Sequence, residues 1–181
     1  LFNMSHDIRT PMNAIIGYTQ LARQEELSPA VREYLGKIDT SSRHLLALIN
    51  DILEMSRIEN GKIELEETEV NFYTVIKEIV AIIQGSADQK NIRFSLSLEN
   101  ISDSNIIIDT LRFKRVMLNI LTNAIKYTME RGYVNFTVKQ LTAAKKGEAM
   151  YEFSVADNGI GMSRDFVRHI FDSFSRERSS S

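Results

Sequence analysis

The sequence predicts an α plus α/β protein, in which an N-terminal antiparallel helical hairpin precedes an α/β sandwich. Two observations support this fold class. Apolar residues over the first 60 positions repeat with heptad-like spacing, which is typical of packed helices. Beyond Gly61, segments with strand periodicity alternate with amphipathic helical segments. We therefore divide the 181 residues into domains 1–62 and 63–181, and the 43% hydrophobic content suffices for two small cores.

The first predicted helix carries an apolar stripe with 4, 3, 4, 3 spacing. Its members are Ile8, Met12, Ile15, Thr19 and Ala22. Pro11 lies inside this helix, where a proline removes one hydrogen bond at a cost of about 3 kcal/mol. The carbonyl that loses its donor belongs to Asp7, next to His6, so the helix is expected to bend there.

A second helix is predicted from Pro29 to Gly61, because Ser28 is a good N-cap and Pro29 a good first helical residue. Its apolar stripe consists of Val31, Leu35, Ile38, Leu45, Ile49 and Ile52. This helix has about 30 residues and the visible part of the first about 24, so we expect the first to begin upstream of Leu1. One hairpin leaves its apolar seam uncovered, which predicts a homodimeric four-helix bundle.

The second domain, of about 115 residues, has a normal size for one fold unit. Its predicted elements are a linker and short strand over 63–72, a helix over 73–90, strands over 92–98 and 105–109, a helix over 110–132, and strands over 133–140 and 150–157. The polar loop LTAAKKGEA joins the last two strands, which indicates a hairpin.

The composition excludes several classes of protein. With 22 basic and 24 acidic residues the net charge is −2, so no basic excess favours nucleic acid or an anionic membrane as a partner. The absence of cysteine excludes disulfides and thiolate metal sites and is typical of a reducing compartment. No signal peptide or long apolar run occurs, so we expect a soluble cytoplasmic segment without direct membrane contact.

His6 is the first candidate for chemistry. On a helix Thr10 lies one turn further along the same face, and Asp7 projects about 100° away. An imidazole with a pKa near about 6.5 is mostly neutral at pH 7 and can act as a nucleophile. The carboxylate of Asp7 can fix its tautomer, and the hydroxyl of Thr10 can orient a water. We interpret His44 and His169 as ordinary solvated or packed side chains.

The helix predicted over 110–132 has one apolar and one polar face. The apolar face holds Met117, Leu118, Leu121, Ala124 and Ile125, and the polar face holds Arg112, Arg115, Asn119, Asn123 and Lys126. An ordinary amphipathic helix would explain the basic residues, but two asparagines four residues apart are poor choices for a merely solvated face. Amide oxygens suit magnesium, and the basic side chains suit phosphate oxygens.

The stretch YEFSVADNGIG supplies a third candidate site. Period two places Asp157 at the strand end, on the same inward face as Tyr151, Phe153 and Val155. An Asp-Asn-Gly turn that caps a hairpin is the simple alternative. The glycines that follow, at 159 and 161, let the backbone approach a flat ligand, and the carboxylate can accept a hydrogen bond from an amine such as that of adenine.

The last segment combines a predicted helix with a basic tail. Its helically spaced apolar residues, which we expect in the core, are Phe166, Val167, Ile170, Phe171 and Phe174. Arg176 and Arg178 follow them, a composition typical of a lid over phosphates or of a simple loop.

Together these motifs resemble the catalytic core of a sensor histidine kinase of two-component systems. SHDIRTP resembles the H box of that family, NILTNAIKYT its N box, DNGIGM its G1 box and FDSFSR its F box, in the family order. The resemblance covers nearly the whole chain. It implies a dimerisation and phosphotransfer hairpin followed by a Bergerat-type ATP-binding domain, with a mixed sheet and helices on one face.

The resemblance implies ATP-dependent autophosphorylation on a histidine and phosphotransfer to an aspartate in the receiver domain of a response regulator. By this resemblance His6 is phosphorylated, Asp7 is its acid–base partner, and Thr10 positions water for dephosphorylation of the regulator. Arg176 matches the arginine that approaches the γ-phosphate. Bending at Pro11 would then supply the mechanical freedom of a phosphotransfer helix.

The same resemblance implies an ATP and magnesium site. Asn123 matches the magnesium ligand, and Asp157 matches the residue that reads adenine. The other matching positions are Asn119, Lys126, Tyr127, Gly159 and Gly161. The glycine-rich G2 box of the family does not occur before Ser181, so we expect the ATP site to be incomplete within this segment.

Two alternatives remain open at this point. A dimeric scaffold that binds a response regulator without catalysis is the first, and the intact His6 and Asn123 argue against it. A different ATPase of the same fold is the second, and the hairpin of residues 1–62 argues against that one. The sequence of this segment is compatible with a parent protein that is an inner-membrane sensor.

Overall fold

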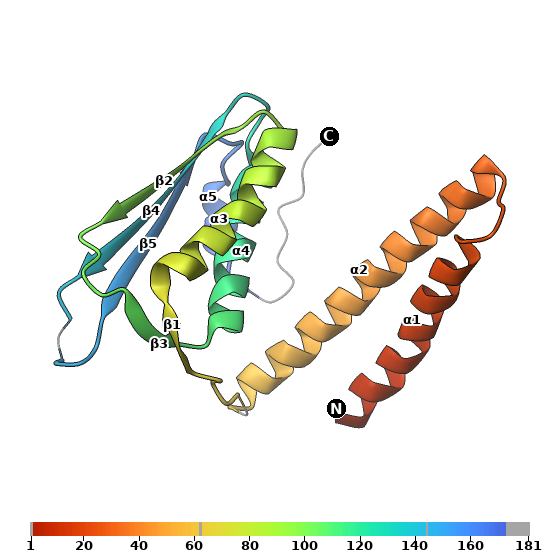
Figure 1. The fold of residues 1–181 in the computed structure, drawn as a ribbon, viewed down its shortest axis with the longest axis horizontal. Coiled ribbons are helices and arrows are strands. Elements are labelled where there is room, and N and C mark those ends of the chain that lie inside the picture. The colour runs from red at the N-terminus through yellow and green to blue at the C-terminus, as the bar shows by residue number, and fades with distance from the viewer. Residues whose placement is uncertain (1, 62, 144, 173–181) are drawn as a thin grey trace. The chain divides into compact units, whose positions relative to one another are not determined.

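The computed structural model describes residues 2–61, 63–143 and 145–172, except for the side chains of residues 2–6 and Glu59. The chain divides into two compact units, Leu1–Glu64 and Leu65–Ser181. The first is helical and the second combines helices with strands (Figure 1). Among the described helices, none combines the length and apolar character that a membrane span requires.

The first unit is the predicted helical hairpin. Helix α1 spans Phe2–Ala22 and runs through Pro11 without ending there, and α2 spans Pro29–Glu59. The hydroxyl oxygen of Ser28 accepts a hydrogen bond from the backbone N–H of Val31 at 3.4 Å, so it caps α2 as expected. The prediction of a helical N-terminal region is therefore confirmed.

The apolar stripe predicted on the second helix proves to be two stripes. Residues that are buried or half-buried recur at 4, 3 spacing and include Leu35, Ser42, Leu46, Ile49 and Leu53. A second stripe is between 39% and 60% exposed and consists of Val31, Tyr34, Ile38, Leu45, Leu48, Ile52 and Met55. The predicted stripe mixed members of both, because neighbouring rows on one helix share nearly the same period.

The second unit contains a three-stranded mixed sheet in the order β2-β4-β5 and a separate antiparallel pair, β1 with β3. Strand β4 pairs parallel with β2 and antiparallel with β5. The elements are β1 (Thr68–Asn71), α3 (Phe72–Gln89), β2 (Arg93–Glu99), β3 (Asn105–Ile108), α4 (Thr110–Tyr127), β4 (Tyr133–Leu141), β5 (Met150–Asp157) and α5 (Arg164–Val167). Helices α3 and α4 cover one face of the sheet (Figure 1), so the predicted fold class is confirmed.

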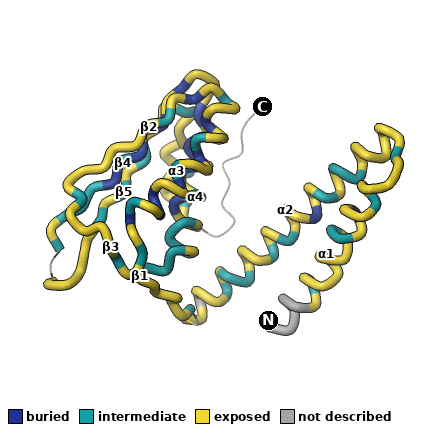
Figure 2. The backbone as a smooth tube through the Cα atoms, in the orientation of Figure 1, coloured by how far each residue is buried: buried dark blue, intermediate teal, exposed yellow. Residues whose placement is uncertain are grey.

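The core of this unit lies between the two long helices and the central strand β4 (Figure 2). The fully buried large side chains include Phe72, Ile76, Ile79 and Ile83 of α3, Leu121 of α4, and Val134, Phe136 and Val138 of β4. Burying a side chain of this kind contributes about 1.5–3 kcal/mol. This packing fixes the apolar face of α4 against the sheet and leaves its polar face outside.

Two predicted elements are shorter than expected. Helix α4 ends at Tyr127 instead of residue 132, because the chain turns there and Arg131 adopts φ 65°. The predicted core helix near the C-terminus is only the four residues of α5, and Phe171 is 96% exposed. Val167 is exposed as well, and Phe174 lies outside the described residues. Helical spacing identifies an apolar face but not what covers it, and the core assignment of Val167 and Phe171 is wrong.

Asp109 caps α4 and ties the preceding linker to it. Its Oδ1 accepts from the backbone N–H of Arg112 at 3.0 Å, and its Oδ2 accepts from the backbone N–H of Glu66 at 3.2 Å. The first of these hydrogen bonds is the main reason that the pKa of Asp109 is lowered. The ionised carboxylate therefore stabilises the folded state.

A pH-dependent stability follows from this lowered pKa. Above the ordinary Asp pKa of 3.8, the wild-type chain is expected to be more stable than Asp109→Asn, which keeps the shape without the charge. As the pH falls through the lowered folded-state pKa, the carboxylate is protonated and this advantage disappears. Urea midpoints of both proteins, measured at pH 7 and at about pH 3, test this. A difference that stays constant across that range would contradict it.

Candidate functional site

The three residues of the predicted phosphoacceptor motif lie within one turn of α1. His6 is helical, and its side chain is outside the described part of the structure. Asp7 and Thr10 are exposed, and each is engaged in a further interaction. Pro11 has no N–H to donate to the Asp7 carbonyl. Helix α1 nevertheless continues through Pro11 to Ala22, so the motif lies on an uninterrupted helix.

The polar face of α4 is arranged as predicted. Met117, Leu121, Ala124 and Ile125 are buried, whereas Arg115, Asn119, Asn123, Lys126 and Tyr127 are exposed. The side-chain amides of Asn119 and Asn123 have no hydrogen-bond partner among the described residues. The ammonium of Lys126 lies 4.9 Å from the centre of the Tyr127 ring, a cation–π distance. Arg112 differs, because its Nε pairs with Asp109 at 3.0 Å.

Asp157 ends strand β5 with one carboxylate oxygen engaged and one available. Its Oδ1 accepts from the backbone N–H of Gly159 at 2.8 Å, which forms a tight local turn. Its Oδ2 has no partner in the described part of the chain. The register pairs Asp157 with buried Val134, so it lies on the inward-facing row as predicted. Because it lies at the strand end, it is nevertheless exposed.

The segment Asp157–Gly161, called the DNG loop below, packs against the last turn of α4. The N–H of Ile160 donates to the Tyr127 carbonyl at 3.2 Å. A Cβ at Gly159 would lie 2.5 Å from that same carbonyl oxygen, so only glycine fits. Gly161 has φ +69°, which also favours glycine. The fold therefore brings two motifs together that are about 30 residues apart in the sequence.

Two residues that organise this region were missed or undervalued in the sequence. Asn158 accepts from the backbone N–H of Tyr133 through Oδ1 at 2.7 Å, which anchors the DNG loop to the start of β4. Lys90 donates to backbone carbonyls of α4 that lie 35 and 36 residues further along the chain. No local pattern indicates a contact of that kind. The predicted Arg176 lies outside the described residues.

Comparison with known proteins identifies both parts of the chain. Residues 1–61 match the family described as His Kinase A (phospho-acceptor) domain. Residues 108–181 match the family described as histidine kinase-, DNA gyrase B-, and HSP90-like ATPase. The chain is 34% identical to the signal transduction histidine-protein kinase BarA of Escherichia coli (strain K12) over 96% of its length, and it covers 19% of BarA.

The virulence sensor protein BvgS of Bordetella bronchiseptica is 40% identical over 97% of the chain, which covers 14% of BvgS. Among solved structures, full-length ShkA in complex with AMPPNP superposes with a TM-score of 0.76 and 31% identity. That match covers 90% of this chain and 34% of ShkA. The chain thus spans about a fifth or less of the curated relatives named here. It belongs to the family of two-component sensor histidine kinases, with a phosphoacceptor domain followed by an ATPase domain.

Proposed function

We propose that this chain is the catalytic core of an ATP-dependent protein-histidine kinase that phosphorylates itself on His6. The observation that carries the proposal is the contact between the DNG loop and the last turn of α4, which joins Asp157 to Lys126 and Tyr127. Residues 1–62 form the dimerisation and phosphotransfer domain, and residues 63–181 form the ATP-binding domain. The division of the chain at Glu64 supports this boundary.

The side chains around the DNG loop fit a magnesium nucleotide. Asn119 and Asn123 present amide oxygens without partners among the described residues, and such hard oxygen ligands suit magnesium. The ion would neutralise phosphate charge when bound. Asn123 is its proposed ligand, while Asn119, Lys126 and Tyr127 contact the phosphates.

The purine end of the nucleotide is assigned to the DNG loop. The Oδ2 of Asp157 accepts a hydrogen bond from the exocyclic amine of adenine, because its Oδ1 is already engaged by Gly159. The close packing of Gly159 on the Tyr127 carbonyl and the left-handed backbone at Gly161 set the path of the DNG loop that carries Asp157. Arg176 is proposed to approach the γ-phosphate from the segment that follows.

The phosphoryl step needs one nucleophile and one proton acceptor. A lone pair of the neutral His6 imidazole forms the new P–N bond while the bond between the β-phosphate oxygen and the γ-phosphorus breaks, and ADP leaves. Asp7 accepts the proton from the other ring nitrogen. An aspartate in a response regulator receiver domain then receives the phosphoryl group. Thr10, one turn along the helix, orients a water molecule that hydrolyses the phosphoryl group from that regulator.

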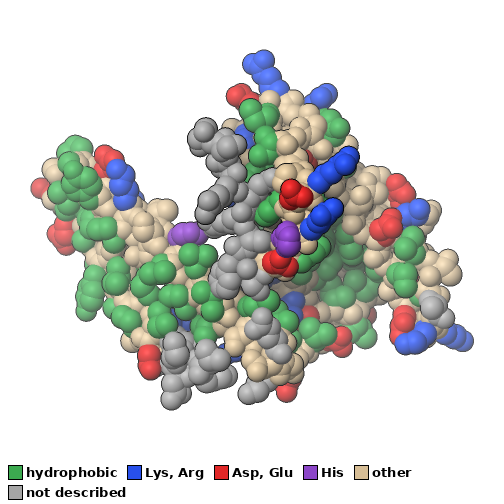
Figure 3. Space-filling view, turned by 180° about the vertical axis from the view of Figure 1, so that it is seen from behind, with side chains coloured by type: hydrophobic (Ala, Val, Ile, Leu, Met, Phe, Trp, Pro, Cys, Tyr) green, Lys and Arg blue, Asp and Glu red, His purple; other side chains and the backbone are tan. Residues whose placement is uncertain are grey.

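A homodimer is proposed because the described residues of the hairpin include a set of exposed apolar side chains. Hydrophobic side chains gather along the hairpin (Figure 3). Besides the exposed stripe of α2, they include Ile15, Tyr18 and Leu21 of α1, which are 44%, 73% and 58% exposed. A contiguous apolar surface of this kind marks an interaction site. A second copy of the hairpin provides a matching surface for a four-helix bundle.

Leu45→Asp tests this dimer. Leu45 is 48% exposed in the middle of the stripe, so an added charge costs little in a monomer but would be buried in a bundle. We expect the variant to be monomeric by light scattering at concentrations where the wild type is dimeric. Asn50→Asp adds the same charge outside the stripe and should remain dimeric. If Leu45→Asp also remained dimeric, the interface would lie elsewhere.

The test of the kinase activity is incubation with radiolabelled ATP and magnesium. We expect a phosphoryl label that is labile to acid and stable to base, on the peptide that contains His6. A chain that binds ATP but gains no label would act as a scaffold for a response regulator, and the kinase proposal would be wrong.

A further inference from the structure

We propose that Lys90 is a positioning residue for the nucleotide site. Its ammonium group fixes the last turn of α4, and through this turn it holds the DNG loop in place. The inference rests on the proposed function, because it assigns a role in nucleotide binding. It is carried by the hydrogen bonds of the helix end, which are described next.

The last four carbonyls of a helix have no N–H donor within the helix, so each needs a hydrogen-bond donor from elsewhere. In α4 the Ala124 carbonyl accepts from the N–H of Thr128 at 3.0 Å. Lys90 Nζ donates to the Ile125 carbonyl at 3.1 Å and to the Lys126 carbonyl at 2.7 Å. The Tyr127 carbonyl accepts from Ile160, in the DNG loop. Lys90 therefore satisfies half of this helix end, and the DNG loop satisfies the next carbonyl.

Lys90 is itself held firmly at the end of α3. It is the C-cap of that helix and is half-buried. The next residue, Asn91, adopts φ 54° and donates from Nδ2 to the Glu130 side chain at 3.0 Å. The N–H of Arg93 donates to the Gly132 carbonyl at 3.0 Å. The turn after α3 is thus tied at two points to the chain that runs from α4 to β4, which places Lys90 beside the end of α4.

The position of the ammonium matters for two reasons. A positive charge at a helix C-terminus is favourable because the carbonyls there carry partial negative charge. Without it, the Ile125 and Lys126 carbonyls lose charge-assisted hydrogen bonds and the last turn is free to fray. That turn carries the side chains of Lys126 and Tyr127, and its final carbonyl holds Ile160. Both halves of the proposed nucleotide site therefore depend on the same turn.

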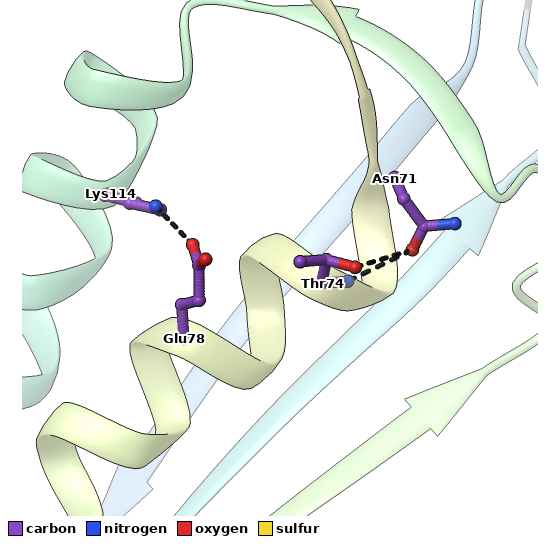
Figure 4. Close-up of polar contacts among 4 residues, drawn as sticks. All are labelled: Asn71, Thr74, Glu78 and Lys114. Carbon is purple, nitrogen blue, oxygen red and sulfur yellow. Dashed lines mark hydrogen bonds and ion pairs between the residues drawn. The ribbon is translucent and has the colours of Figure 1, made fainter.

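The structure offers a matched control. Lys114 also joins α4 to α3, through an ion pair with Glu78 (Figure 4). This pair lies near the start of α4, more than two turns before Lys126, and away from the DNG loop. Lys90→Met and Lys114→Met each remove one ammonium between the same two helices. Lys90→Arg keeps a positive donor at the helix end.

The experiment measures three quantities on the full chain. These are the affinity for AMPPNP by calorimetry, the exchange rate of the Ile160 amide by NMR without nucleotide, and the urea midpoint. Lys90→Met is expected to weaken AMPPNP binding by about tenfold, the order expected for lost charged hydrogen bonds, and to speed Ile160 exchange. Lys90→Arg should stay near the wild type. Lys114→Met should leave both the affinity and the exchange rate unchanged, even if its urea midpoint falls equally.

Two results would overturn the inference. If the two methionine variants weakened binding equally, Lys90 would only hold α3 against α4. If Lys90→Met bound AMPPNP like the wild type, with Ile160 exchange unchanged, the last turn would not depend on the ammonium at all. Failure of the wild-type chain to bind AMPPNP would instead reject the proposed function, and the role of Lys90 in nucleotide binding with it.

Discussion

Replacing His6 with alanine is expected to abolish phosphoryl labelling of the chain while its affinity for ATP stays unchanged. The alanine removes the proposed nucleophile, and the sequence of α1 contains no second histidine that could replace it. The nucleotide site is assigned to the other compact unit, Leu65–Ser181. Labelling with radioactive ATP and calorimetric titration of the same preparation separate the two effects.

His44→Ala is the matched control for this result. His44 is an exposed histidine on α2, and the sequence gives it no chemical role, so its variant should be labelled like the wild type. An acid-labile, base-stable label that persisted in His6→Ala would remove His6 from its proposed role. Loss of the label in both variants would point to damage to the hairpin instead.

Asp157→Asn is expected to weaken ATP binding by at least about tenfold, equivalent to about 1.4 kcal/mol. The amide oxygen of asparagine can still accept from the N–H of Gly159, so the turn of the DNG loop should keep its shape. The second carboxylate oxygen, proposed to accept from the adenine amine, becomes an NH₂ donor that repels it. Calorimetry with ATP measures the loss.

Comparison with GTP and with a control variant sharpens this test. The asparagine presents a donor where adenine also presents a donor, so discrimination against GTP should fall together with ATP affinity. Asp51→Asn changes an exposed carboxylate on α2, in the other unit, and should bind ATP like the wild type. Unchanged ATP affinity in Asp157→Asn would exclude Asp157 as the adenine-reading residue.

Local chemistry made most of the elements predictable. Ser28 and Gly61 bound α2 because capping and helix termination depend on residues close in the chain. The buried and exposed faces of α4 followed from the period of an amphipathic helix, which places Leu121 inside and Asn123 outside. The DNG turn followed from the ability of an Asp side chain to accept from the backbone two residues on.

Contacts between distant segments were decided only by the tertiary structure. Periodicity could not separate the buried and half-buried stripe of α2 from the exposed one, because both repeat with nearly the same spacing. It could not show that β2 pairs parallel with β4, or that Gly159 packs on the Tyr127 carbonyl. The donation from Lys90 to the end of α4 likewise depends on chain folding. The sequence by itself determined which residue types stand ready for phosphoryl chemistry and in which local structure. Long-range packing alone, which no local propensity encodes, decided which of them meet.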